Sequence, residues 1–309
     1  MSKKKIKDCF LIYNRKSKQN IKNAKDFATT WQSKIGSNVI FRETKSLEDI
    51  QVAAKESLKK ECIPVFLGGD GTFSECLQGL AESEKFKGIK IPVGLLSGGT
   101  GNSFLRDFNV VNFKTAKEKF IDAVLNNRIQ KIDMGILKYK TKDEKIVQRI
   151  VFNIWSAGII GKITELAIKM RFIGSFNYTA ATIMQLLFHK PFDFEVTIDQ
   201  KKENMRIDFV SVSNSRFTGG AMEMAPPVKI NDGKLFYVIP RINSPLKLLT
   251  LFPKIFKGEH IKHKKVLSGF CKNLSIKYDK EMLMNIDGEI ERGYNSEIKI
   301  MPKFWSLYI

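Results

Sequence analysis

The chain has 309 residues, 43% of them hydrophobic and 27% charged, which is usual for a globular protein of about two domains. Its apolar runs are shorter than the roughly 20 residues that a membrane-spanning helix needs, and the run after Lys5 is too short for a secretion signal. These observations exclude a transmembrane helix. The four cysteines stand singly, without a CxxC pair, which is typical of reduced thiols in a cytoplasmic protein.

The chain is strongly basic, with 52 Lys and Arg against 32 Asp and Glu and a net charge of +20. Such a charge favours anionic partners: nucleic acid, acidic lipid headgroups or phosphorylated substrates. A general bias toward lysine would give the same count. Charge alone therefore does not choose among these partners.

Short apolar runs alternate with amphipathic segments in residues 1–132. The predicted strands are Cys9–Tyr13, Val39–Phe41, Ile63–Leu67 and Ile91–Leu95. The predicted helices are Asn23–Ile35, Leu47–Lys59, Phe73–Ala81 and one that runs onward from Ser103. Strands that alternate with helices of this length predict a parallel, doubly wound α/β domain.

In residues 133–309 the character changes to β-like segments separated by Gly, Asn and Asp turns. The predicted strands are Gly135–Tyr139, Ile146–Ile154, Phe194–Ile198, Met205–Ser213, Lys234–Ile239, Asn273–Tyr278 and Ser296–Ile300. Between them lies one long helical stretch, Lys162–Phe188, interrupted near Gly174. This pattern predicts a β-sandwich as the second domain.

Two glycine-rich turns follow neighbouring predicted strands and open into helical patterns, Gly68–Thr72 and Gly98–Ser103. Glycines allow close backbone approach, and the N–H groups of a helix start bind phosphate oxygens. Thr72 and Glu75 also have the spacing of a capping box. Either turn alone could be only a tight turn, but two of them at adjacent strand ends predict one ligand crevice. Neither turn has the pattern of a Walker A loop or of a dinucleotide-binding fingerprint.

The ordered motifs resemble the diacylglycerol kinase catalytic domain family, which includes bacterial diacylglycerol kinases, YegS-like lipid kinases and sphingosine kinases. The motifs that carry the resemblance beyond the two turns are Lys131–Gly135, Asn153 with Gly158, Gly219–Met222 with Pro226, Asp232–Leu235 and Asp287–Glu289. The resemblance implies an α/β plus β fold. Its parts are an N-terminal doubly wound nucleotide domain like that of NAD kinases and phosphofructokinases, residues 1–132, and a C-terminal β-sandwich domain, residues 133–309.

Two positions depart from the family pattern. The Asn-Pro-x-x-Gly sequence that follows the first strand in the family is Asn14 to Lys18 here and keeps only the asparagine. The aspartate that often follows Gly-Thr-x-Asn is Ser103, which removes one acid from the network around the phosphates. Both departures concern the binding of nucleotide and magnesium.

The resemblance implies that the protein binds ATP with Mg²⁺. The residues implied to bind ATP are Asn14, Thr44, Gly68, Gly69, Asp70, Gly71, Thr72, Glu75, Gly99, Thr100, Gly101 and Asn102. Asp70 would orient hydrated Mg²⁺ at the phosphates or serve as a catalytic base.

The resemblance makes Asp287-Gly288-Glu289 the general-base motif. We expect Glu289 to accept the proton and Asp287 to act as its partner, and the reverse assignment stays open, as does Asp70 as the base. Without the family context an Asp-Gly pair is usually only a turn.

By the same resemblance, Asp232 would ligate a structural Mg²⁺ with the backbone carbonyls of Lys229 and Lys234, since hard cations prefer oxygen ligands. A hairpin turn without metal is the alternative. The histidines His189, His260 and His263 form no metal set in the sequence, and we expect them at the surface.

The segment Leu246–Lys265 mixes leucine, isoleucine and phenylalanine with lysine. This composition suits an interfacial helix at an anionic membrane, although Pro253 would kink it. A helix packed on the sandwich with a solvated basic face is the alternative.

The function that the resemblance implies is transfer of the γ-phosphate of ATP to a lipid hydroxyl, with diacylglycerol or a related lipid as acceptor. The enzyme would be cytoplasmic and peripherally bound to the anionic inner face of the membrane. Its partners would be ATP and the lipid, with no nucleic acid, and a homodimer is left open. The alternatives are an NAD-kinase-like small-molecule kinase and a non-catalytic protein that binds nucleotide and membrane.

Overall fold

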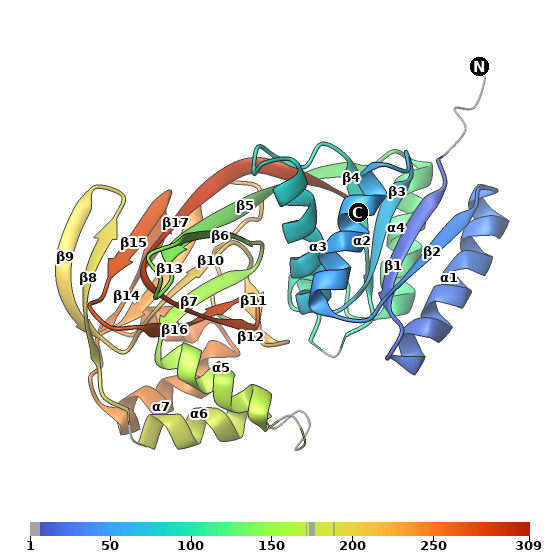
Figure 1. The fold of residues 1–309 in the computed structure, drawn as a ribbon. Coiled ribbons are helices and arrows are strands. Elements are labelled where there is room, and N and C mark those ends of the chain that lie inside the picture. The colour runs from blue at the N-terminus through green and yellow to red at the C-terminus, as the bar shows by residue number, and fades with distance from the viewer. Residues whose placement is uncertain (1–6, 100, 171, 173–176, 188) are drawn as a thin grey trace. The chain divides into compact units, whose positions relative to one another are not determined.

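A computed structural model of the chain describes residues 7–99, 101–170, 172, 177–187 and 189–309, and Figure 1 shows its elements as a ribbon. The chain divides into two compact units. The first unit comprises Met1–Ile132 with Lys303–Ile309, and the second comprises Asp133–Pro302. No helix among the described residues is long and apolar enough to cross a bilayer.

The first unit is built on a parallel sheet. Its strands are β1 (Cys9–Asn14), β2 (Val39–Thr44), β3 (Ile63–Gly68) and β4 (Pro92–Ser97), in the order β2-β1-β3-β4. The end of β17 (Glu289–Tyr308) adds a further parallel strand, with Ser306 opposite Pro92. The runs CFLIY in β1 and IPVFLG in β3 are buried throughout, as expected for strands covered on both faces.

Helices cover this sheet on both faces: α1 (Lys18–Ile35), α2 (Leu47–Leu58), α3 (Asp70–Ser83) and α4 (Phe113–Leu125), with a short 3₁₀ helix η1 (Phe104–Phe108). The helix α1 packs with α4, and α2 packs with α3. In the first pair the buried ring of Trp31 stacks on that of Phe120, with ring centroids 5.7 Å apart. Side-chain caps fix the starts of α1, α2 and α4 at Ser17, Ser46 and Asn112.

The second unit is a β-sandwich. One layer has the order β14-β13-β10-β7-β16-β17, and the other contains β9, β8, β15, β17, β5 and β6, so that β17 belongs to both. The strands not yet given are β5 (Ile129–Lys140), β6 (Ile146–Val151), β7 (Ile154–Gly158), β8 (Phe192–Ile198), β9 (Lys201–Ile207), β10 (Phe209–Ser213), β13 (Leu235–Pro240), β14 (Val266–Cys271), β15 (Asn273–Lys277) and β16 (Met282–Ile286). A separate hairpin pairs β11 (Phe217–Thr218) with β12 (Met222–Glu223). The two layers share one apolar core around Trp155 and Phe194.

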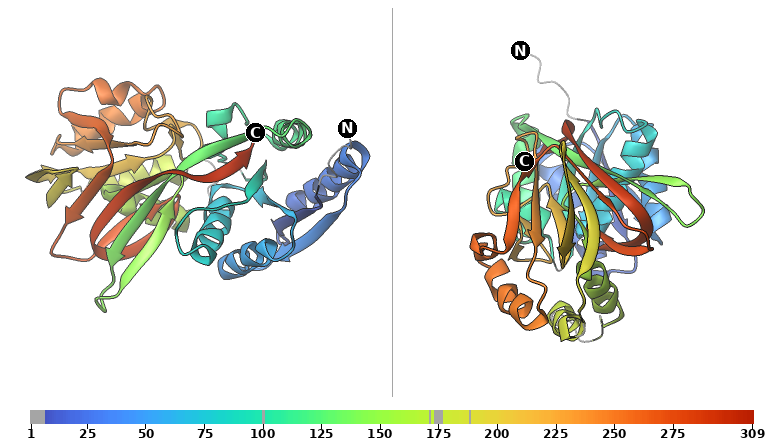
Figure 2. Two further views of the ribbon diagram at one scale, coloured as in Figure 1. Left: turned by 90° about the horizontal axis from the view of Figure 1, so that it is seen from above. Right: turned by 90° about the vertical axis from the view of Figure 1, so that its left-hand side faces the viewer.

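Helices pack on the outside of the sandwich: α5 (Ile159–Lys169), α6 (Asn177–Leu187), α7 (Pro245–Ile255) and the 3₁₀ helix η3 (Glu259–Lys262). Figure 2 shows the yellow-green α6 and the orange α7 side by side, outside the strands. A second apolar core lies beneath them, in which Leu186 of α6 and Leu251 of α7 join Phe209 and Phe236 of the sheet.

The predicted fold class, α/β plus a β-sandwich, is confirmed, and three element boundaries are corrected. The helix expected onward from Ser103 is only η1, because Asn109 adopts a left-handed conformation with φ of 56°. The strand expected over Ile146–Ile154 breaks after Val151, where two backbone N–H groups donate to the carboxylate of Asp287 and not to a neighbouring strand. The strand expected over Met205–Ser213 breaks at Asp208.

Two local expectations were wrong. The helix α3 begins at Asp70 with Gly69 as its N-cap, so Thr72 lies inside the first turn and forms no capping box with Glu75. The histidines His189 and His260 are not surface residues. The ring of His189 is buried beside Asp208, with Nε2 2.9 Å from Oδ1, and His260 is buried with Nε2 3.1 Å from the carbonyl oxygen of Met224.

Candidate active site

The two glycine turns meet at the carboxyl ends of β3 and β4. The backbone N–H of Gly98 donates to the carbonyl oxygen of Gly68 over 2.7 Å. A Cβ atom on Gly99 would lie 2.5 Å from the Cα atom of Gly69, so a side chain at Gly99 would displace backbone. The close approach of the two turns therefore requires glycine, and the start of α3 at Asp70 supplies helix N–H groups beside it.

The carboxylate of Asp70 joins the two turns. Its Oδ2 accepts from the backbone N–H of Ser103 over 2.8 Å, and its Oδ1 accepts from that of Phe104 over 3.3 Å. Burial raises the pKa of Asp70, while these two N–H groups, the Ser103 hydroxyl and the nearby Arg106 lower it in part. The serine at position 103 thus gives Asp70 a donor where the motif often has a second carboxylate.

Asn102 closes the second turn on itself. Its Nδ2 donates to the carbonyl oxygen of Gly99 over 2.7 Å, and its backbone has a φ of 47°, in the left-handed region that asparagine tolerates. Its Oδ1 is buried and accepts no hydrogen bond from the described residues. Gly101 precedes it, and Thr100 lies outside the described residues.

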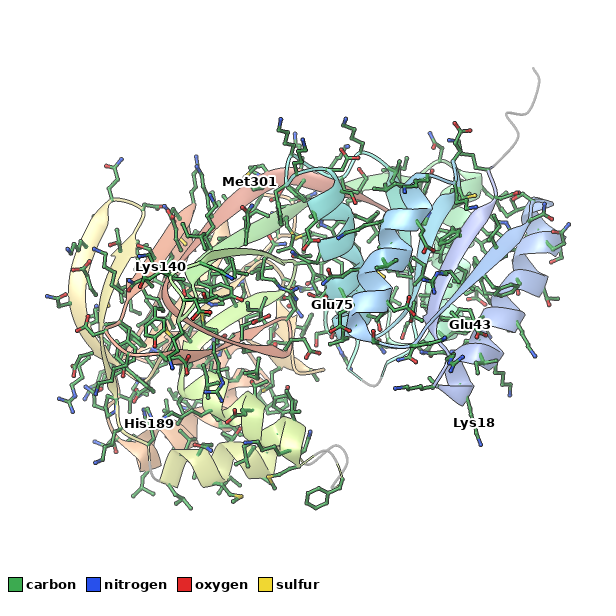
Figure 3. The ribbon with its side chains drawn as sticks, viewed as in Figure 1. Lys18, Glu43, Glu75, Lys140, His189 and Met301 are labelled. Carbon is green, nitrogen blue, oxygen red and sulfur yellow. The ribbon has the colours of Figure 1, made fainter. Side chains whose placement is uncertain are left out.

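Asn14 and Thr44 lie opposite one another at the ends of β1 and β2. The Oδ1 of Asn14 accepts from the backbone N–H of Lys16 over 2.9 Å, and the buried Thr44 donates its hydroxyl to the carbonyl oxygen of Tyr13. The cations of Arg15 and Lys16 in the loop between β1 and α1 are exposed, as is that of Lys18 at the start of α1, which is labelled in Figure 3.

Three further predicted residues of the first unit lie on α3. Gly71 and Thr72 lie in the first turn of α3, and the Thr72 side chain packs against Gly68. Glu75, labelled in Figure 3, is buried one turn further along, and its Oε2 accepts from Nε2 of Gln51 on α2. The Glu75 carboxylate thus contributes to the packing of α2 on α3.

The second unit carries the Asp-Gly-Glu motif. Asp287 and Gly288, with φ of 52° and 100°, form the two-residue turn between β16 and β17, in which Ile286 pairs with Glu289. Two positive φ angles are the requirement of a type I′ hairpin turn, which Asp-Gly favours. The motif is therefore a tight turn as well as a cluster of carboxylates.

The carboxylate of Asp287 is buried and occupied by backbone donors. It accepts from the N–H groups of Phe152, Asn153 and Ile154 over 3.1, 3.0 and 2.8 Å. Glu289 differs, because its half-buried carboxylate forms no hydrogen bond or ion pair with any residue that the structure describes. The two carboxylates of the motif thus have different environments: backbone N–H groups hold that of Asp287, whereas that of Glu289 can still accept hydrogen bonds.

Comparisons with known proteins identify the family of this chain. Residues 8–137 match the family described as the diacylglycerol kinase catalytic domain, and residues 153–309 match the YegS C-terminal NAD kinase beta sandwich-like domain. The second match alone covers half of the chain. The chain belongs to the family of diacylglycerol kinases and YegS-like lipid kinases. It is a lipid kinase, as the resemblance in its sequence implied.

Relatives and solved structures agree with the family. A diacylglycerol kinase of Mycobacterium tuberculosis (strain ATCC 25618 / H37Rv) is 28% identical over 239 residues, 76% of this chain and 72% of the relative. One from Staphylococcus carnosus is 25% identical over 283 residues, 90% and 87% of the two chains. A diacylglycerol kinase structure from Bacillus anthracis matches with a TM-score of 0.72 at 18% identity, covering 99% and 98%. Yeast NADH kinase matches with 0.57 at 14%, covering 99% and 83%, so the fold is shared with NAD kinases.

The candidate metal site of this lipid kinase lies in the turn before β13. The Oδ1 of Asp232 accepts from the backbone N–H of Lys234 over 3.0 Å, and its own N–H lies 3.4 Å from the carbonyl oxygen of Lys229. Burial, followed by the charge of Asp133, raises the pKa of Asp232. A carboxylate whose charge is disfavoured, beside a backbone carbonyl, fits a hard cation such as Mg²⁺. Among the described residues, no group of three or more His, Cys, Asp or Glu could hold a metal ion.

The sequence alone did not indicate a network of buried polar side chains in the second unit of the lipid kinase. Asp133 is fully buried and accepts from the N–H of Gly233 over 2.6 Å, and Asn214 donates to the carbonyl oxygens of Asp133 and Phe152. The Ser215 hydroxyl donates to Oδ1 of Asn153. The signal available in the sequence was polar residues within apolar, strand-like runs, which indicates buried side chains with partners.

Proposed function

We propose that this lipid kinase transfers the γ-phosphate of ATP to the hydroxyl group of diacylglycerol or a related lipid. The observation that carries the proposal is the backbone contact between Gly69 and Gly99, because phosphoryl transfer depends on positioning the phosphates and on stabilising their charge. Glycine at positions 69 and 99 places no side chain at this contact, and the start of α3 adds its dipole.

ATP would be held by the two turns and by the end of β1. We assign phosphate contacts to Gly68, Gly69 and Gly71 with Thr72, and to Gly99 with Gly101 and Asn102. Asn14 and Thr44 shape the edge of the sheet beside the exposed cations of the β1–α1 loop. Mg²⁺ bound with ATP would neutralise phosphate charge, and Asp70 would orient the water around that ion.

Glu289 is our choice for the proton acceptor. Three backbone N–H groups donate to the Asp287 carboxylate and leave it little capacity to accept a hydrogen bond from a substrate hydroxyl. The Glu289 carboxylate keeps its full capacity as an acceptor. As the lipid oxygen forms its bond to phosphorus and the bond to ADP breaks, the hydroxyl proton would move to the Glu289 carboxylate. Asp287 would then act as a positioning residue that fixes the turn.

Asp232, with the carbonyl oxygens of Lys229 and Lys234, would hold a second, structural Mg²⁺. Burial and, after it, the charge of Asp133 raise the pKa of Asp232, and a bound cation would offset both effects. We further propose that the enzyme acts as a peripheral protein on the cytoplasmic, anionic face of a membrane, where its net charge of +20 favours binding.

An assay with radiolabelled ATP against a panel of lipids in mixed micelles tests the proposal, with NAD as a soluble acceptor. The proposal expects label in diacylglycerol, or in a related lipid such as a sphingoid base, and none in NAD. Label in NAD alone would assign an NAD-kinase-like activity. ATP binding without transfer to any acceptor would assign a non-catalytic nucleotide-binding protein.

A further inference from the structure

The exposed face of α6 is apolar. The helix buries Ala181, Thr182 and Leu186, yet Ile183 and Leu187 on its outer side are 41% and 56% exposed. A surface helix normally places charged residues outward, but α6 has no charged residue at all. Its outer face therefore lacks the solvation expected of a helix that faces only water.

The neighbouring α7 repeats this arrangement. Its inner face buries Leu248 and Leu251 in the core of the second unit, while Leu246 is 71% exposed. Phe256, directly after the helix, is exposed as well. The sequence left open whether this segment packs on the sandwich or serves as an interfacial helix, and the two faces of α7 allow both.

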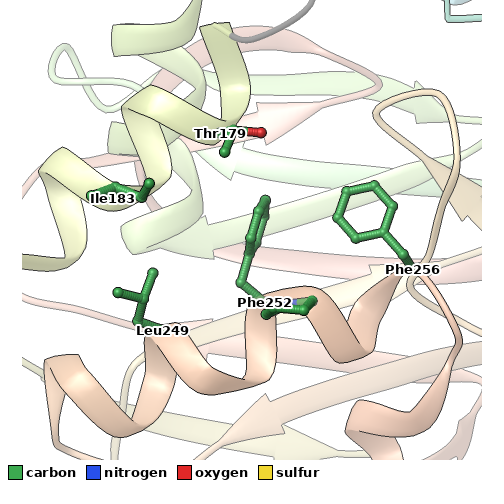
Figure 4. A pocket seen from close by; sticks show the side chains of 6 residues that line it. Thr179, Ile183, Leu249, Phe252 and Phe256 are labelled. Carbon is green, nitrogen blue, oxygen red and sulfur yellow. The ribbon is translucent and has the colours of Figure 1, made fainter.

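An apolar groove of about 510 Å³ separates the two helices. Figure 4 shows Ile183 and Thr179 on α6 above Leu249 and Phe252 on α7, with Phe256 at one end. Five of the six lining residues are apolar: Ile183, Leu249, Phe252, Pro253 and Phe256. The lining thus suits a hydrocarbon chain better than a polar ligand.

Lysines surround this face. Six exposed lysines lie on α7 or in the segment after it, and Glu259 is the single acidic residue in the sequence from position 245 to 265. They are Lys247, Lys254, Lys257, Lys262, Lys264 and Lys265. None of their ammonium groups forms an ion pair with a described residue. The charge is therefore available to an anionic partner.

We propose that the outer face of α6 and α7 is a membrane-docking site that seats on anionic phospholipid, with an acyl chain in the groove. The inference rests on the proposed function, since a lipid kinase must reach a substrate held in a bilayer. Apolar side chains beside unpaired lysines match the acyl and headgroup layers of such a surface. A second copy of the chain fits less well, because a two-fold contact through this face would bring lysines against lysines.

Binding to vesicles of phosphatidylcholine, with or without phosphatidylglycerol, tests the docking site. The Ile183→Asn/Leu246→Asn variant should lower affinity about tenfold for both vesicle types, because it removes exposed apolar anchors. The Lys254→Gln/Lys257→Gln variant should lower affinity only where phosphatidylglycerol is present, by about fivefold for each lysine. Added salt should weaken the same component.

The β5–β6 hairpin of the same unit offers a matched control. Ile146 is 71% exposed, and Lys142 and Lys145 beside it are exposed too. The Ile146→Asn/Lys142→Gln/Lys145→Gln variant should bind both vesicle types like the wild type. Equal loss in this control and in the variants of α6 and α7 would overturn the docking site, as would wild-type binding by the α6 and α7 variants.

Two further measurements separate this inference from the proposed function. All variants should phosphorylate a short-chain, water-dispersed diacylglycerol at the wild-type rate, because every substituted side chain is exposed and outside the proposed catalytic residues. A wild-type protein that phosphorylates no lipid refutes the kinase proposal, while the vesicle result still decides the docking site. A wild-type dimer, measured by light scattering, that Ile183→Asn/Leu246→Asn converts to a monomer would assign the face to a second copy and overturn the inference.

Discussion

The backbone N–H of Ser103 donates to Oδ2 of Asp70 over 2.8 Å, so a side chain of the first glycine turn holds the backbone of the second. The Ser103 hydroxyl also favours the charged form of Asp70. The residue that departs from the family pattern thus supports the acid that remains. At the position where the family pattern often has a second carboxylate, this chain has donors that hold the carboxylate of Asp70 in place.

Replacing Asp70 by asparagine should separate stability from activity. Burial raises the pKa of Asp70, so its charge costs stability at neutral pH, and this cost disappears as the pH falls through the raised pKa. Asparagine removes that cost, but its NH₂ group would face a backbone N–H that then lacks an acceptor. The unsatisfied donors would lower the free energy of unfolding by about 1–3 kcal/mol. Because the two effects oppose, we expect Asp70→Asn to change the free energy of unfolding little, and to lower kcat at least about 100-fold.

Urea unfolding and the lipid phosphorylation assay measure these two quantities for Asp70→Asn. The control is Asp26→Asn, which removes an exposed carboxylate paired with Lys117 and should leave both nearly unchanged. Wild-type turnover in Asp70→Asn would show that this carboxylate only holds the two turns together and takes no part in catalysis.

A methyl group at Gly99 should damage nucleotide binding. Its Cβ would lie 2.5 Å from the Cα atom of Gly69, and backbone cannot yield as a flexible side chain would. We expect Gly99→Ala to weaken ATP affinity at least about tenfold, measured by titration calorimetry.

The control is Gly36, the C-cap of α1, where a Cβ atom would meet nothing within 4 Å but the backbone φ is 79°. Gly36→Ala should therefore lose about 1 kcal/mol of stability and bind ATP normally. Equal affinities in the two variants would contradict the phosphate site.

The sequence predicted most elements of the first unit well, because the strands β1, β3 and β4 are almost wholly apolar runs. The strand over Ile63–Leu67 and the helix from Leu47 follow from such patterns and are present with nearly the predicted bounds.

Some of the errors arise where a distant residue decides local structure. The break after Val151 depends on Asp287, 136 positions later, which takes the N–H groups of Phe152 and Asn153 from the sheet. Likewise, the burial of His260 depends on its contact with the carbonyl oxygen of Met224. No local pattern contains such partners. For the same reason the sequence named Asp287 and Glu289 together but could not separate their roles.

The buried His260 should make stability depend on pH. Burial lowers the pKa of His260, although its contact with the Met224 carbonyl opposes this in part. The unfolded chain therefore binds a proton more readily than the native one, so stability is complete above the unfolded value of about 6.5 and is lost as the pH falls below it. His260→Gln keeps a donor for Met224 but cannot titrate. Urea unfolding at pH 5.5 and 7.5, values chosen about one unit either side of that pKa, should show a smaller difference in this variant than in wild type.

The control for His260 is His263→Gln, which removes a half-buried histidine and should keep the pH dependence of the wild type. If the two variants respond to pH alike, burial of His260 has no part in acid sensitivity.

Glu289→Gln should abolish most catalysis while preserving the fold. A lipid hydroxyl is a weak nucleophile until a positioned base takes its proton, and such a base contributes about 10²- to 10⁴-fold. Glutamine keeps the size of Glu289 without its basicity. It breaks no hydrogen bond or ion pair with a described residue, so we expect kcat to fall by about that factor while the melting temperature and ATP affinity stay at wild-type values.

The variant Asp287→Asn tests the positioning role of Asp287, because an amide cannot accept from all three backbone N–H groups that hold the carboxylate. This variant should lose about 1–3 kcal/mol of stability as well as activity, since buried donors lose their acceptor. Kinetics for both variants on the best lipid acceptor, with urea unfolding alongside, distinguish the roles. Full turnover in Glu289→Gln, together with loss of kcat in an Asp287→Asn variant that stays folded, would reverse the assignment and make Asp287 the base.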